Sequence, residues 1–323
     1  MDLTVNLPSL EFMAGLGQEE KELLFLRSRS AGLYICGCAH AVFVYKLFSL
    51  LRTNLSEESN SSSKPHLSVG ILGGGHLGKQ LAKVLLHSAK IRPRDMNVST
   101  KRPETLGEIS SLGVECYCDN LRLAKWADLL FLCVLPTDLP QVCSDLRCHL
   151  PPGCLLYAFT CATALNRLAM LLDHSFIIKP QYGFVACEEE TVWSCHHRVM
   201  DALKDKAVIS ASNPFSMKGG LFLNNAWVPS VIYALLNICT TEKLSSQNSL
   251  RLLNELFHSK MFTNHSFVTS PNASQPDNCF PWISLVEVQS TQTPLSDLLS
   301  RNEALRDCIS ILYCNVLSTL ENE

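Results

Sequence analysis

Three glycines at a fixed spacing are the first residues of this chain that could serve chemistry. Gly73, Gly75 and Gly78 stand in VGILGGGHLGKQLAKVLL, between a short apolar run and an amphipathic run. This spacing permits a tight turn, leaves the backbone bare where phosphates approach, and lets a helix pack closely on a strand. Free N–H groups at the start of that helix favour negative charge. The motif predicts a dinucleotide site that includes His76 and Leu77; the alternative is a purely structural turn.

The residues at the end of the next expected strand bear on the choice of cofactor. Sites that prefer NAD usually place Asp or Glu here, about 20 residues after the glycines, to hold the ribose hydroxyls. This chain has Ser99, Thr100, Lys101 and Arg102, with no carboxylate before Glu104. The hydroxyls can donate to a phosphate, and the two cations favour the 2′-phosphate of NADP. The sequence therefore predicts NADP as the cofactor; a solvated basic turn is the alternative.

The segments that position these residues alternate between apolar strands and amphipathic helices. The expected strands are 67–73, 96–100, 114–118, 128–136, 153–159 and 175–180. The expected helices are 76–90, 103–113, 120–127, 137–150 and 165–172. This alternation predicts right-handed crossover units and an α/β fold with a doubly wound parallel sheet.

Composition and pattern divide the chain into four parts. We expect an N-terminal helical extension at 1–52, a Ser-rich linker at 53–66, an NADP-binding domain at 67–182 and a helical C-terminal domain at 183–323. In the last part, helices are expected at 224–244, 249–262 and 305–320. The apolar segment Ala31–Leu51 is interrupted by His40 and Lys46, and its uncharged part is shorter than a membrane span needs. We expect it to form a buried or docking helix.

Composition also restricts the partners and the location. The formal net charge is −3 and no dense basic block occurs, so we expect no nucleic-acid partner. The 15 cysteines, with no secretory leader, predict reduced thiols and an intracellular, cytoplasmic protein that is not attached to a membrane. We expect a small-molecule substrate that the sequence does not identify, and any homodimer to form through the C-terminal helices.

Four stretches together resemble the pyrroline-5-carboxylate reductases and the wider group that shares their NADP-binding domain. They are VGILGGGHLGKQLAKVLL, the Ser-Thr-Lys-Arg turn, DNLRLAKWADLLFLCVLP and LLYAFTCATALNRL, and the resemblance covers about residues 67–179. It implies a Rossmann-like domain and an oxidoreductase that transfers hydride between NADP(H) and a small C=N or C=O substrate. It also implies contacts of Asn120 with the adenosine side, and of Val134, Leu135, Pro136, Thr160, Cys161 and Ala162 with the nicotinamide side.

The chain departs from that family where the substrate should bind. Leu135 replaces a lysine of the family, and Thr160-Cys161-Ala162-Thr163 lacks the glycine of the family's Cys-Ala-Ala-Gly segment. The family's Ser-Gly-Ser-Gly-Pro-Ala loop, which holds the substrate carboxylate, has no counterpart; NNAWVPSVIYALLN at 224–237 is the nearest region by order. A proline-type product is therefore not carried over. A catalytically inactive NADP-binding sensor or scaffold is the alternative function.

Residues beyond the last expected strand of the sheet are the remaining candidates for chemistry. Lys179 and Tyr182 lie near the expected cleft, where a Tyr hydroxyl beside a Lys could donate a proton as hydride arrives. The alternative is that Tyr182 packs at a domain interface. We expect NNAWVPS to close the other wall with Trp227 near the nicotinamide, unless Trp227 is a core residue. No metal site is predicted, because the spacing matches no common zinc pattern at Cys187, Cys195, His196 and His197.

Overall fold

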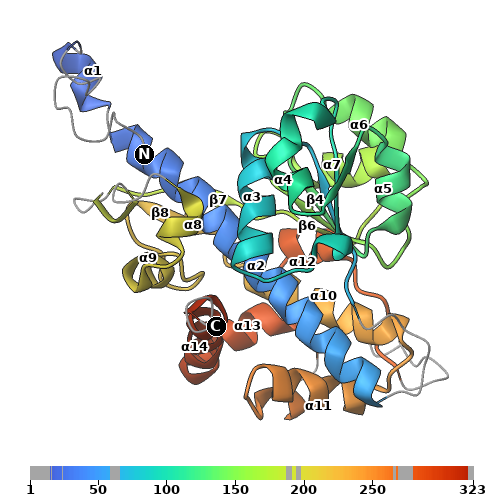
Figure 1. Cartoon of the computed structure of the whole chain (residues 1–323). Coiled ribbons are helices and arrows are strands. Elements are labelled where there is room, and N and C mark those ends of the chain that lie inside the picture. The colour runs from blue at the N-terminus through green and yellow to red at the C-terminus, as the bar shows by residue number, and fades with distance from the viewer. Residues whose placement is uncertain are drawn as a thin grey trace.

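A six-stranded parallel sheet forms the core of one part of the molecule, which is a computed structural model (Figure 1, upper right). The strand order is β3-β2-β1-β4-β5-β6. The strands are β1 Val69–Leu72, β2 Met96–Ser99, β3 Glu115–Tyr117, β4 Leu129–Leu132, β5 Leu155–Ala158 and β6 Ile177–Ile178. The described residues are Gly15, 17–23, 25–58, 66–186, 191–193, 198–264, Phe267 and 279–318.

The sheet confirms the predicted doubly wound, Rossmann-like α/β fold. β1 pairs in parallel with β2 on one side and with β4 on the other, with Leu72 opposite both Ser99 and Leu132. The strand order therefore reverses at β1, which opens a crevice beyond its carboxyl end. Every residue of β1, β2, β4 and β5 is buried, as expected where helices cover both faces of a parallel sheet.

Helices connect the strands at the predicted places. They are α3 His76–His87, α4 Gly107–Ser111 after the 3₁₀ turn η4 Pro103–Leu106, α5 Asn120–Trp126, α6 Leu139–Leu146 and α7 Leu165–Leu172, with the short η3 Pro93–Asp95 before β2. α3 forms because Leu81, Val84 and Leu85 recur at helical spacing and bury one face on the sheet. α5 begins at Asp119, whose carboxylate accepts the backbone N–H of Arg122 at 2.8 Å.

One long helix joins the sheet layer to the C-terminal helices. α2 Phe25–Glu58 follows the short α1 Gln18–Glu22 and passes between the two parts in Figure 1. Its middle is buried on nearly all sides, which is typical of a core helix. By length and composition it could cross a membrane, yet 72% of its most apolar window is buried inside the molecule. The helix continues to Glu58, six residues into the predicted linker, because Leu55 is still buried against the core.

The C-terminal part is mainly helical, as predicted. Its helices are α8 Val199–Ala202, α9 Lys206–Ala211, α10 Trp227–Thr241, α11 Ser246–Leu256, α12 Leu285–Ser290, α13 Pro294–Arg301 and α14 Glu303–Ser318, with 3₁₀ turns η5 Thr191–Trp193 and η6 Met261–Asn264. Leu305, Ile309, Leu312 and Val316 recur at helical spacing and are buried on α14; the last two residues of the helix expected at 305–320 lie outside the described residues. The sequence did not predict the antiparallel pair β7 Tyr182–Phe184 and β8 Leu221–Leu223.

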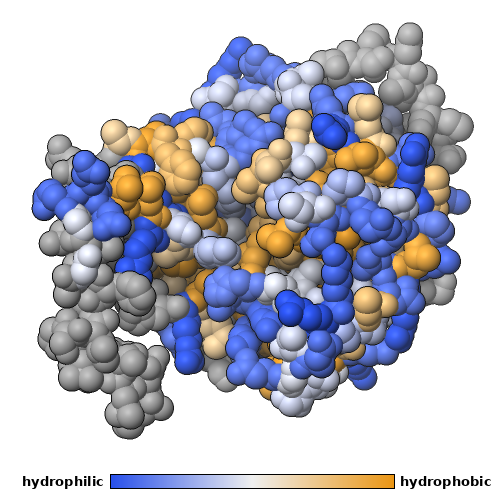
Figure 2. All heavy atoms as spheres, turned by 90° about the horizontal axis from the view of Figure 1, so that it is seen from above, coloured by the Kyte–Doolittle hydropathy of each residue, from blue (hydrophilic) through white to orange (hydrophobic). Residues whose placement is uncertain are grey.

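The surface mixes hydrophilic and apolar groups. Seen from above, apolar side chains occur in scattered groups among hydrophilic ones (Figure 2). Scattered exposed apolar residues are normal for a globular protein. This face therefore gives no separate indication of a binding surface, and the search for a site turns to the carboxyl edge of the sheet.

Candidate functional site

The glycine turn lies beyond the carboxyl end of β1 and leads directly into α3. Gly73 has a φ of +108°, and a Cβ there would come 2.5 Å from the carbonyl oxygen of Cys133. A Cβ on Gly78 would come 1.9 Å from the carbonyl oxygen of Gly73. The packing of the protein itself therefore requires glycine at both positions.

Gly75 is different, because nothing in the described structure requires its lack of a side chain. It is exposed, its backbone is extended at φ −71° and ψ −167°, and a Cβ there would meet nothing within 4 Å. It immediately precedes the first turn of α3, where no side chain caps the free N–H groups. His76 and Leu77 form that turn. The residues present thus fit a pyrophosphate at this helix end, as NADP(H) would place one.

The turn after β2 has one buried residue and two exposed cations. Ser99 is wholly buried, and its hydroxyl donates to Oδ1 of Asn120 at 2.8 Å. The Nδ2 group of Asn120 donates in turn to Asp145 at 2.9 Å. The expectation that Ser99 donates to a phosphate is therefore replaced: its hydroxyl positions Asn120 instead. Lys101 and Arg102 are exposed beside the crevice, as a contact with a 2′-phosphate requires.

Residues after β4 and β5 complete the carboxyl edge of the sheet. Leu135 and Pro136 are exposed and Val134 is half-buried. After β5, Thr160 is buried, and its hydroxyl has no hydrogen-bond partner among the described residues. Such an orphaned group at a crevice is available to a bound ligand. Cys161 and Ala162, which follow it, are exposed.

A cavity of about 250 Å³ lies at this edge, and we call it the α2 pocket. Its lining comes from α2, the first turn of α3, and the chain after β5 and β6: Ser30, Leu33, Tyr34, Leu77, Phe159, Cys161, Pro180 and Tyr182. The Tyr34 ring meets the His76 ring edge-on at a centroid distance of 5.2 Å. α2 can approach so closely because position 37 is glycine; a Cβ there would lie 3.2 Å from the Phe159 ring.

The wall of the α2 pocket corrects the expectation that NNAWVPS closes the cleft. None of the residues 224–230 lines this pocket, although Asn224, Ala226 and Trp227 line a separate cavity of only about 10 Å³ with Lys179. Trp227 is only 2% exposed, and its ring packs on His40 at a centroid distance of 4.8 Å. Trp227 is therefore a core residue, and α2 supplies the wall. The sequence did not predict that α2 would line a pocket, because the only pattern in this helix was its apolar character.

The hydroxyl of Tyr182 points into the core. His40, on α2, is wholly buried; its Nδ1 lies 2.7 Å from the Tyr182 hydroxyl and its Nε2 lies 2.9 Å from the carbonyl oxygen of Ser212. A carbonyl oxygen only accepts, so we assign the imidazole proton to Nε2, and Nδ1 then accepts from Tyr182. Burial lowers the pKa of His40 to about 4, which keeps the ring neutral. Tyr182 therefore packs at the interface between β7 and α2, and its proton is committed to His40.

Lys179, the other candidate proton donor, directly follows β6 at the edge of the sheet. It is 7% exposed, and burial lowers the pKa of its ammonium group while the nearby Cys161 opposes that shift. Among the residues that the structure describes, none offers this ammonium a carboxylate or a hydrogen-bond acceptor. Its backbone N–H donates to Oε1 of Gln289 at 2.9 Å, which fixes the end of β6. A buried, unpaired lysine of this kind is typical of functional sites.

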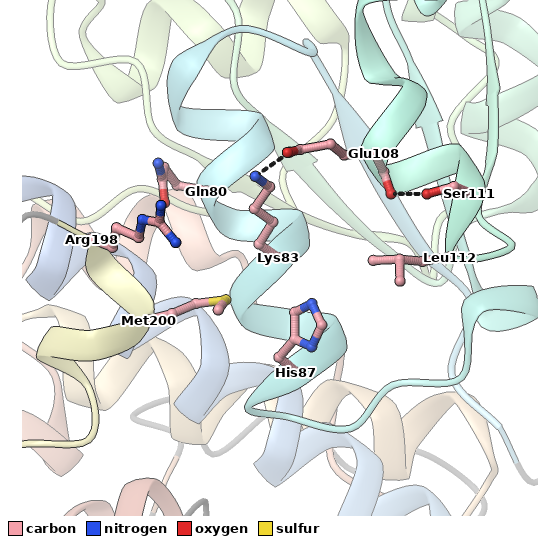
Figure 3. Close-up of a pocket in the computed structure, with 8 residues that line it drawn as sticks. All are labelled: Gln80, Lys83, His87, Glu108, Ser111, Leu112, Arg198 and Met200. Atoms are coloured by element: carbon pink, nitrogen blue, oxygen red, sulfur yellow. Dashed lines mark hydrogen bonds and ion pairs between the residues drawn. The ribbon is translucent and has the colours of Figure 1, made fainter. Parts of the chain in front are cut away.

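Two larger cavities lie away from the carboxyl edge. One, of about 420 Å³, is on the outer face of α3, where Lys83 forms an ion pair with Glu108 (Figure 3). The other, of about 560 Å³, lies among α13, α14 and the chain after α9. Neither is lined by a predicted cofactor or catalytic residue, although Asn225 of the NNAWVPS segment lines the second one. The described part of the chain holds no group of three or more potential metal ligands, and Cys187, Cys195, His196 and His197 lie outside it.

Comparison of the sequence with known proteins gives one match over the full chain and others over the sheet domain. The mouse NADP-dependent oxidoreductase domain-containing protein 1 is 37% identical over 353 residues, covering 100% of this chain and 95% of the mouse protein. The pyrroline-5-carboxylate reductase of Escherichia coli (strain K12) is 25% identical over 107 residues, covering 33% of this chain and 40% of that protein. A family model described as "NADP oxidoreductase coenzyme F420-dependent" matches residues 68–156.

Solved structures of pyrroline-5-carboxylate reductases are similar to the chain at lower identity. The enzyme from Coxiella burnetii is 16% identical, with a TM-score of 0.34 over 80% of this chain and 99% of that one. The enzyme from Plasmodium falciparum, solved with NADP bound, is 14% identical, with a TM-score of 0.32 over 79% of this chain and 98% of that one.

Proposed function

Because the chain belongs to the family of NADP-dependent oxidoreductase domain-containing protein 1, we propose that it binds NADP(H) along the carboxyl edge of its parallel sheet and transfers hydride between NADP(H) and a small C=N or C=O substrate. The observation that carries this proposal is Gly75. Its missing side chain is not needed for the packing of the protein, yet it leaves a helix N-terminus open to phosphate.

The cofactor would lie across the carboxyl ends of the strands, with its adenosine end near β2 and its nicotinamide end near β4 and β5. The glycine turn and the first turn of α3 would hold the pyrophosphate, and Lys101 and Arg102, with Thr100 and Asn120, would hold the adenosine end. The nicotinamide end would be lined by Val134, Leu135, Pro136, Thr160, Cys161 and Ala162. Bound NADPH supplies a hydride, and the protein supplies position and electrostatics.

The substrate would enter the α2 pocket, whose lining points to an apolar carbon skeleton. Leu33, Tyr34, Leu77 and Phe159 supply most of the apolar lining of the pocket. Apolar and aromatic walls with few polar groups select ligands by shape and by buried apolar area.

Lys179, which precedes the pocket-lining Pro180 in the chain, would give a proton to the substrate nitrogen or oxygen as the adjoining carbon accepts hydride. Burial favours the neutral amine that remains after the proton has left, because it lowers the pKa of Lys179. Tyr182 supports Lys179 only indirectly, since its own proton is held by His40. Solvent at the open edge of the sheet would return the proton to Lys179 after each turnover.

Substitution of Gly75, with Gly153 as the control position, tests whether NADPH binds at the glycine turn. Gly75→Val should abolish NADPH binding without changing the melting temperature of the free protein, because its Cβ meets only open space. Gly153→Val is the matched control: its Cβ would lie 3.8 Å from Thr241, before β5 and at the other end of the sheet. Normal NADPH binding by Gly75→Val would place the cofactor elsewhere and remove the main support for the proposal.

Turnover separates an enzyme from the alternative of a sensor or scaffold. We expect the unmutated protein to oxidise NADPH in the presence of cyclic imines or ketones with an apolar skeleton, and to respond less to small polar analogues. NADPH binding with no turnover across such a panel would instead support a non-catalytic NADP-binding protein.

A further inference from the structure

An ion pair bridges the two loops that flank the glycine turn. The ammonium group of Lys101, which follows β2, donates to Oδ1 of Asp138 at 2.7 Å. Asp138 follows β4 and immediately precedes α6. β2 and β4 are the two neighbours of β1 in the sheet. The pair therefore spans the crevice that opens beyond β1, at the end where the basic turn lies.

The position of Asp138 in its own helix indicates that its carboxylate is drawn toward Lys101. An Asp at the start of a helix usually accepts a hydrogen bond from a backbone N–H of the first turn. Asp138 makes no such bond, and its backbone is helical, at φ −88° and ψ −16°. Its carboxylate instead reaches across to Lys101, whose other functional assignment is the 2′-phosphate.

The pair is weak enough to open when a better anion arrives. The side chains of Lys101 and Asp138 are 75% and 36% exposed, and ion pairs of this kind contribute little stability. A phosphate monoester carries up to two negative charges and three acceptor oxygens, so it competes well for an ammonium group.

We propose that Asp138 holds Lys101 across the crevice in the cofactor-free protein and competes with the 2′-phosphate of NADP(H) for it, so that Asp138 sets the preference between NADP(H) and NAD(H). This inference rests on the proposed function, since it concerns the same cofactor site. Arg102, the exposed cation beside Lys101, has no recorded ion-pair partner among the described residues and would bind the phosphate without such competition.

Calorimetric titration of the full chain with NADPH and with NADH tests this role. Asp138→Asn removes the competing charge and should tighten NADPH binding about fivefold, while NADH affinity changes less than about twofold. Asp201→Asn is the control, because Asp201, on α8, carries the same charge and forms another exposed ion pair, with Lys204 at 3.2 Å. The control should leave both affinities unchanged.

The double variant Lys101→Met/Asp138→Asn, compared with Lys101→Met alone, shows whether the gain in NADPH affinity depends on Lys101. Once Lys101 is gone there is nothing to compete for, so Asp138→Asn should then gain less than about twofold for NADPH. The proposal is overturned by an unchanged NADPH affinity in Asp138→Asn, by an equal gain for both cofactors, or by the same gain with and without Lys101. If the unmutated protein binds neither cofactor, the proposed function fails and this inference fails with it. If the unmutated protein binds NADPH, the proposed function stands, and the three outcomes above test the role of Asp138 separately.

Discussion

The hydroxyl of Tyr182 donates a hydrogen bond of 2.7 Å to Nδ1 of His40, which joins the start of β7 to the middle of α2. The two rings are also nearly parallel, at 7°, with centroids 5.7 Å apart. This contact fixes α2 over the carboxyl edge of the sheet, and it removes the Tyr182 proton from the pocket that α2 covers. The N-terminal helix is therefore part of the candidate site, and Lys179 is left as the proposed proton donor.

Acid should destabilise the protein through His40. Its pKa is about 4 in the folded chain and 6.5 ordinarily, so the unfolded chain binds more protons between these values. The free energy of unfolding should therefore be highest above pH 6.5 and should fall by about 3 kcal/mol as the pH drops to 4. Denaturant titrations at several pH values measure it. His40→Gln, which cannot titrate, should flatten this slope; an unchanged slope in that variant would assign the acid sensitivity to other groups.

Lys179 should control both the rate and its pH dependence. Lys179→Met should lower kcat by about 10²-fold or more while NADPH affinity stays within about twofold, because the residue donates a proton rather than holding the cofactor. In the unmutated protein, reduction should slow as the pH rises through the lowered pKa of Lys179, and Lys179→Arg should move that limb to higher pH. A Lys179→Met variant with full activity would transfer the proton donor to another group or to water.

The wall formed by α2 should decide substrate affinity without affecting the cofactor. Leu33→Asp places a charge in the α2 pocket and should raise KM for an apolar substrate about tenfold or more. Leu50→Asp is the matched control, since Leu50 is an exposed leucine of the same helix that does not line the pocket. Equal effects of the two substitutions would mean that the charge acts on the helix as a whole and not on the pocket.

Arg102 should distinguish the two cofactors. Loss of a charge-assisted contact costs about 1.5–3 kcal/mol, so Arg102→Asp should weaken NADPH binding at least about tenfold and leave NADH nearly unaffected. The affinities of the unmutated protein for NADPH and NADH, measured by the same titration, provide the reference. Equal weakening of both cofactors would show that Arg102 acts on a part that they share, such as the pyrophosphate.

Local patterns allowed the sheet domain to be predicted from the sequence, because each of its elements has its own periodicity and the glycines mark the turn. The pair β7 and β8 was missed, since three-residue strands are too short to show alternation. The α2 pocket was missed for another reason: Tyr34, Leu77 and Phe159, which line it, are brought together only by tertiary packing. Burial of Trp227 and of Ser99 likewise depends on neighbours distant in the chain. The expected intracellular location and the dimer through the C-terminal helices stay predictions.

The affinity of the unmutated full-length chain for NADPH, compared with NADH in the same buffer, tests the central claim most directly. Isothermal titration calorimetry gives both dissociation constants. The glycine turn and the two cations of the basic turn predict one binding site per chain, with NADPH bound about tenfold or more tightly than NADH. Equal affinity for the two cofactors, or no binding of either, would contradict the account.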